Sequence, residues 1–78
     1  MKEFAIRLAS VQEVQEFVAL ATAQPFPVTV ADVRHCVNGK SFMEIFCLNV
    51  SRPLLVSANC TEEAFLRFRQ AALPFLKD

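Results

Sequence analysis

The residues that could support covalent or metal chemistry are few in this sequence. Its 78 residues include one histidine, His35, and three cysteines, at positions 36, 47 and 60. A tetrahedral zinc site needs four donors, and the sequence has no CxxC pair and no spaced partner for His35. No group of residues suggests a nucleophile with its base and an oxyanion site. We therefore expect no metal, no cofactor and no enzyme activity.

Two Ser-x-x-Glu patterns are the clearest local motifs, and both predict the start of a helix. They are Ser10 to Glu13 and Ser41 to Glu44. In a capping box the serine hydroxyl accepts from the glutamate amide, and the glutamate carboxylate accepts from the serine amide. We expect this reciprocal pair at both positions.

The segment after Ser41 is short and unusually apolar. On a helix, Ile45 and Leu48 can point inward, and Phe42, Met43 and Phe46 then gather on another face. So much apolar area on one short helix cannot all be buried. An exposed apolar patch of this kind suggests a docking surface for another molecule.

The bulk composition narrows the class of protein. Apolar residues make up 54% of the chain, eight of them phenylalanine, and the net charge is zero. The chain is long enough for one domain, residues 1–78, and nothing in its charge favours nucleic acid or an anionic membrane. Its longest apolar run is too short to span a bilayer. An odd number of cysteines in a chain that starts at Met1 without a signal peptide indicates reduced thiols in the cytoplasm, packed as small hydrophobic residues.

The first half of the chain predicts a strand and then an amphipathic helix. Residues 4–9 alternate, which predicts a half-buried strand with Phe4, Ile6 and Leu8 inward. Ser10 should cap the helix, which must end before Pro25. Its buried stripe is predicted to be Val14, Phe17, Val18 and Ala21.

A second strand begins at Val28, and two turns compete to end it. Asn38-Gly39 is ordinarily a strong hairpin signal. The alternative places the turn at residues 32–34, with residues 35–37 as the returning strand. We favour the alternative because it leaves Ser41 free to cap a helix, whereas the first turn would force residues 42–48 into a strand with almost no polar alternation.

The last part of the chain predicts a strand over residues 53–58 and a helix capped by Thr61 and ended or kinked by Pro74. The apolar stripe of this helix is predicted to be Phe65, Phe68, Ala72 and Leu73. The resulting order is β-α-β-β-α-β-α. It predicts an α+β, open-faced two-layer sandwich, with a four-stranded antiparallel sheet and three helices on one face.

This order, with Lys40-Ser41-Phe42-Met43 opening the middle helix, resembles HPr, the histidine-containing phosphocarrier protein of the bacterial sugar phosphotransferase system. The likeness covers nearly the whole chain and is clearest from Val28 to Leu55. In that family a Lys-Ser pair, two bulky apolar residues and a small residue begin the middle helix. Glu44 stands here where the small residue is common. Residues 48–52 resemble the family's turn into the last strand.

The sequence departs from the family at the phosphate-carrying site. Family members have a glycine-containing loop, a histidine and an Arg-Pro pair at the head of the first helix, and the histidine takes phosphate from enzyme I. Here the loop is shortened, and Ser10 lies nearest the histidine position. Gln12 and Glu13 lie near the Arg and Pro positions, and His35 falls in the hairpin region. The resemblance therefore implies a divergent member without the catalytic histidine, and so without catalytic residues for phosphohistidine transfer.

The family also implies roles for the middle helix. Ser41 matches the serine that a dedicated kinase phosphorylates in many Gram-positive members, and Lys40 could pair with that phosphate while Glu44 would repel it. Simple capping by Ser41 is the competing interpretation. Phe42, Met43 and Phe46, with Lys40, match the surface through which family members bind partners.

We therefore expect a cytoplasmic, regulatory interaction module that binds phosphotransferase-system or carbon-regulation proteins. A phosphoacceptor modified at Ser41, and a structural or interaction domain unrelated to sugar transport, are the alternatives. Association of the chain with a second copy of itself stays open.

Overall fold

A computed structural model describes residues 2–48 and 50–76, and the order of its elements is the predicted one. The strands are β1 (Lys2–Ile6), β2 (Val28–Ala31), β3 (Cys36–Asn38) and β4 (Leu54–Ala58). The helices are α1 (Val11–Thr22), α2 (Phe42–Phe46) and α3 (Glu62–Ala71), followed by a short 3₁₀ helix, η1 (Leu73–Phe75). The α+β class and the β-α-β-β-α-β-α order predicted from the sequence are confirmed.

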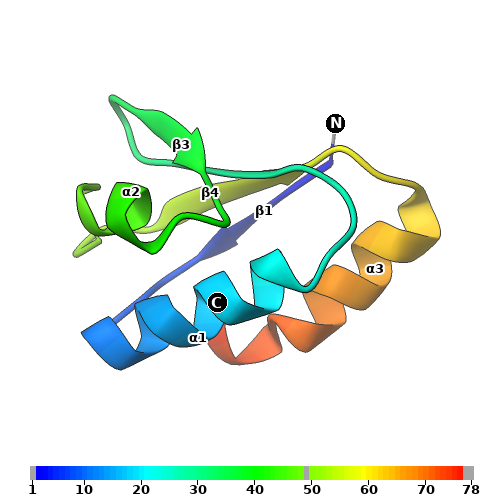
Figure 1. The fold of residues 1–78 in the computed structure, drawn as a ribbon, viewed down its shortest axis with the longest axis horizontal. Coiled ribbons are helices and arrows are strands. Elements are labelled where there is room, and N and C mark those ends of the chain that lie inside the picture. The colour runs from blue at the N-terminus through cyan, green and yellow to red at the C-terminus, as the bar shows by residue number, and fades with distance from the viewer. Residues whose placement is uncertain (1, 49, 77–78) are drawn as a thin grey trace.

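The four strands form one sheet in the order β1-β4-β2-β3, and all neighbours are antiparallel. Val56 in the middle of β4 lies opposite Phe4 of β1 and Val30 of β2. Because side chains alternate along a strand, these three point to the same face, and all three are buried. Figure 1 shows α1 and α3 side by side along the sheet, with α2 near β3.

The core on the helix side of the sheet is built largely from phenylalanine rings. Phe68 of α3 lies with its ring centroid 5.5 Å from that of Phe4, 6.3 Å from Phe17 and 5.7 Å from Phe26. These contacts join α3 to β1, to α1 and to the connection before β2. They explain how a chain without tryptophan or tyrosine fills a core.

The first strand is shorter than predicted, but its inward face is as predicted. β1 ends at Ile6, and Leu8, in the connection that follows, is still buried, with only 2% of its surface exposed. The outer edge of β1 is partly covered by the end of the chain, since the amide of Arg7 donates to the carbonyl of Phe75 at 2.7 Å. Ile6 also bridges to Leu76.

The predicted turn between β2 and β3 is confirmed. The carboxylate of Asp32 accepts from the amides of Arg34 at 2.8 Å and His35 at 2.6 Å, which is the hydrogen-bonding pattern that makes aspartate a turn former. Gly39 instead continues the pairing with β2, because its amide donates to the carbonyl of Val28 at 2.7 Å. The turn that follows, in which the Ser41 amide donates to the Asn38 carbonyl, leads into helix α2 and not into a returning strand.

The predicted stripe of the last helix is wrong at Leu73, which is 47% exposed. α3 ends at Ala71, and Pro74 lies in the η1 turn that follows. That turn breaks the helical spacing and brings Phe75 into the core in place of Leu73. The ring of Phe75 lies edge-on to Phe17 with centroids 6.0 Å apart.

The prediction that the cysteines pack as small hydrophobic residues is wrong for two of them. Cys36 and Cys47 are exposed, and Cys60 is half-buried. Cys36 lies opposite Ala31 on the sheet face away from the core. Within residues 2–48 and 50–76, no three side chains of histidine, cysteine or acid lie close enough to hold a metal ion. No helix of this described part is long and apolar enough to cross a membrane.

Candidate functional site on helix α2

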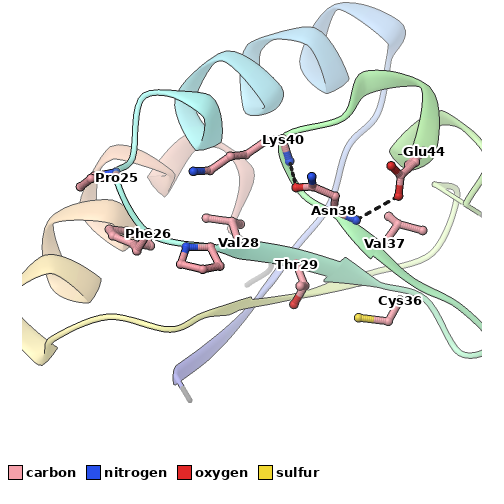
Figure 2. Close-up of a pocket in the computed structure, with 10 residues that line it drawn as sticks. Pro25, Phe26, Val28, Thr29, Cys36, Val37, Asn38, Lys40 and Glu44 are labelled. Atoms are coloured by element: carbon pink, nitrogen blue, oxygen red, sulfur yellow. Dashed lines mark hydrogen bonds between the residues drawn. The ribbon is translucent and has the colours of Figure 1, made fainter.

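At the head of α2, one of the two hydrogen bonds predicted for the capping box is present. The hydroxyl of Ser41 accepts from the amide of Glu44 at 3.4 Å, as expected. The glutamate carboxylate does not return to Ser41, however. It accepts from the amide of Asn38 at 3.2 Å, as the dashed line in Figure 2 marks. The Ser41 amide donates instead to the Asn38 carbonyl at 3.1 Å. The carboxylate therefore ties α2 to strand β3.

The two faces of α2 have opposite environments. Ile45 is fully buried and Leu48 is 6% exposed, as predicted. Met43 is 69% exposed and Phe46 is 48% exposed. Phe42 is half-buried, and its ring stacks on that of Phe46 with centroids 5.5 Å apart and planes 18° from parallel. We call Phe42, Met43 and Phe46 the α2 patch.

Lys40 is held by a contact that the sequence did not suggest. Its ammonium donates to the carbonyl of Gln24, just after α1, at 2.8 Å. Figure 2 shows the side chain reaching towards the α1–β2 connection, along an open depression of about 560 Å³ that Pro25 and Phe26 also line. This bond uses one of the three N–H donors of the ammonium group and directs the side chain towards Gln24.

At the head of α1 the serine hydroxyl is bonded as in α2, but the glutamate carboxylate has a different partner. The Ser10 hydroxyl accepts from the amide of Glu13 at 3.2 Å. The Glu13 carboxylate accepts from the amide of Ala9 at 2.7 Å, so the predicted return to Ser10 is wrong here as well. A depression of about 300 Å³ lies beside this head, lined by Arg7, Leu8, Ala9, Val50 and Ser51.

The histidine lies elsewhere. His35 is in the turn between β2 and β3, and its side chain is 69% exposed. It lines a different depression from the one beside Ser10. The position in the hairpin region expected for His35 is therefore confirmed, and the structure does not bring it to the α1 head.

Comparison with known proteins shows a likeness in structure. No protein-family model and no curated protein matches this sequence. Among solved structures, the crystal structure of HPr-C-His from Thermoanaerobacter tengcongensis matches with a TM-score of 0.73. It is 28% identical, over 90% of this chain and 89% of that one. The chain has an HPr-like fold. In this HPr-like fold α1 and α2 are in contact, so the α1 head and the α2 patch belong to neighbouring elements.

Proposed function

We propose that this chain is a regulatory interaction module of the phosphotransferase-system type that binds a protein partner through the α2 patch. It works in the cytoplasm, is not an enzyme and does not transfer phosphohistidine. The observation that carries the proposal is the division of α2. One face anchors the helix in the core through Ile45, while Met43 and Phe46 on the other face are left in water.

The α2 patch has the energetics expected of a docking surface. Full burial of a Phe or Met side chain contributes about 1.5–3 kcal/mol, and the exposed fractions of Met43 and Phe46 leave much of this to be gained on binding. The Phe42 ring stacks on Phe46 and restricts it before a partner arrives. A side chain that is already ordered loses less conformational entropy on binding.

The geometry at the α1 head supports the absence of phosphohistidine transfer. A serine hydroxyl without an activating base is a poor substitute for an imidazole nucleophile. The Ser10 hydroxyl already accepts from the Glu13 amide, and the Glu13 carboxylate takes the Ala9 amide. A second negative charge at this head is opposed by that carboxylate. His35 lies in another part of the fold.

At Ser41, capping is the role that the contacts favour over phosphate acceptance. Its hydroxyl is used in the cap, and Lys40 is bonded to Gln24. Glu44, three residues on, adds a negative charge to the same turn.

The test is a titration of the ¹⁵N-labelled protein with enzyme I of the phosphotransferase system. We expect amide shifts centred on residues 42–46 and at least a tenfold loss of affinity, about 1.4 kcal/mol, in the Met43→Ser/Phe46→Ser variant. The matched control is Leu66→Ser/Leu73→Ser, which removes two apolar side chains of similar exposure from around α3. The control should bind as the unchanged chain does. Equal losses in both variants, or shifts away from α2, contradict the proposal.

Intact mass tests the phosphate-transfer part separately. After incubation with phosphoenolpyruvate and enzyme I, or with ATP and a family serine kinase, the mass should stay unchanged. A phosphate mapped to Ser41 in the kinase reaction would make the chain a regulated phosphoacceptor instead. A phosphate taken from enzyme I would overturn the assignment as a module without carrier chemistry.

A further inference from the structure

A second surface feature lies between two connections of the fold, and none of the residues that line it belongs to the α2 patch. It is an open depression of about 520 Å³ between the β2–β3 turn and the connection from α2 to β4. A volume of this size is within the range of small-molecule sites in proteins. The residues that line it are Asp32, Val33, Arg34, His35, Cys47, Leu48 and Arg52.

The depression brings together nitrogen-bearing side chains that are distant in sequence. Arg34 and His35 come from the turn, and Arg52 comes from the connection before β4. In the part of the chain that the structure describes, the guanidinium groups of Arg34 and Arg52 form no ion pair and no hydrogen bond. Lys40 and Arg67, by contrast, are bonded to Gln24 and to Glu63. In a chain of zero net charge, two arginines without a protein acceptor in one depression are a local positive centre.

The one carboxylate in the lining, that of Asp32, is directed into the turn. Its side chain is 9% exposed and accepts from the backbone amides of Arg34 and His35. Its Oδ1 lies 3.7 Å from the Nδ1 of His35. These contacts hold the negative charge below the surface, while both arginine side chains and the imidazole are exposed. The charged groups and the imidazole on the open side of the depression are therefore N–H donors.

We propose that this depression binds the phosphate group of a small soluble molecule. A guanidinium group presents its donors in a fork that matches two phosphate oxygens, so Arg34 and Arg52 can hold the anion from two sides. The imidazole of His35 can donate an N–H in either protonation state. Leu48 and Cys47 line the same depression and offer an apolar wall for the uncharged part of the ligand. The site shares no residue with the α2 patch, and this proposal does not rest on the function proposed for that patch.

The test is a titration of the ¹⁵N-labelled protein with sodium pyrophosphate at constant ionic strength, set with sodium chloride. We expect saturable shifts of the amides of residues 33–36 and 51–52. The Arg34→Gln/Arg52→Gln variant should bind at least about tenfold more weakly. The Arg67→Gln/Arg69→Gln variant removes the same charge from the exposed side of α3, and its affinity should stay within about twofold. Amide shifts that do not saturate, or an equal loss of affinity for pyrophosphate in both variants, would contradict the proposal.

A vesicle arm separates a soluble ligand from a lipid headgroup. The protein is sedimented with phosphatidylcholine vesicles with and without phosphatidylglycerol. We expect no difference in bound protein between the two, together with saturable pyrophosphate binding. Sedimentation with the anionic vesicles that depends on Arg34 and Arg52, without pyrophosphate binding, would overturn the assignment to a small soluble molecule. The spectrum of the Arg34→Gln/Arg52→Gln variant is compared with that of the unchanged chain. If it differs only near the two substituted positions, misfolding is excluded as the cause of the lost affinity.

Discussion

Helices α1 and α2 begin with the same four-residue pattern, but the glutamate carboxylates of the two patterns bind different partners. In both, the serine hydroxyl accepts from the glutamate amide. The carboxylate of Glu13 closes onto Ala9, the residue just before its own cap. The carboxylate of Glu44 reaches Asn38, the last residue of strand β3. One contact is local to a helix and the other joins a helix to the sheet.

The difference reflects how much each helix buries. α1 has 12 residues, and Val14, Phe17 and Ala21 are buried along it. α2 has five residues, and Ile45 alone among them is fully buried. A five-residue helix is too short to be stable by itself. α2 therefore depends on a few attachments to its surroundings: Ile45, the Glu44 carboxylate and the close approach of Gly39 to β2. Because these few contacts are enough to hold α2, the side chains of the α2 patch are left free to bind another molecule.

Removing the core anchor of α2 should have the largest effect. Ile45→Ala is expected to lower the free energy of unfolding by about 2–5 kcal/mol, because it leaves a cavity at a fully buried position. Met43→Ala, two residues away on the exposed face, should change it by about 0.5 kcal/mol or less. Urea unfolding measures both. Similar losses in the two variants would mean that α2 is not divided as described.

The close approach before α2 should have the next largest effect. A Cβ placed on Gly39 would lie 2.7 Å from Cγ1 of Val28, 3.1 Å from the Val28 carbonyl oxygen and 3.2 Å from Cγ2 of Val30. Valine side chains are stiff and this backbone is held in the sheet, so Gly39→Ala should destabilise the fold by about 1–3 kcal/mol.

Urea unfolding also measures how much Gly39→Ala lowers the free energy of unfolding. The control is the opposite replacement, Ala23→Gly, at a residue just after α1. The Ala23 change should cost clearly less, because it creates no close contact. A Gly39→Ala variant as stable as the unchanged chain would show that α2 can shift without loss.

The order of elements could be predicted from the sequence because each element carries its own signal. The caps Ser10, Ser41 and Thr61 and the breaks at Pro25 and Pro74 delimit the helices. The β2–β3 turn could be placed because Ser41 needed a free position to cap α2. Such signals are local, so they survive without knowledge of the rest of the fold.

The features that the sequence did not predict depend on the position of another element. The partner of the Glu44 carboxylate depends on where β3 ends, and the partner of Lys40 depends on where α1 ends. Leu73 fits a helical stripe until Pro74 changes the spacing. Arg34 and Arg52 have no special feature as separate residues, and they line one depression only after the sheet has formed.

The smallest effect tests the two glutamates against each other. Glu44→Ala should speed hydrogen exchange at the Asn38 amide, and Glu13→Ala should speed it at the Ala9 amide, each leaving the other site unchanged. Because both contacts are exposed, each loss of stability should be about 0.5–1.5 kcal/mol. The matched variants Glu44→Gln and Glu13→Gln keep a carbonyl acceptor without the charge, so they should retain part of the protection. If Glu44→Ala leaves exchange at Asn38 unchanged, the carboxylate does not join α2 to the sheet. Ile45 and Gly39 would then be left to hold α2 in place.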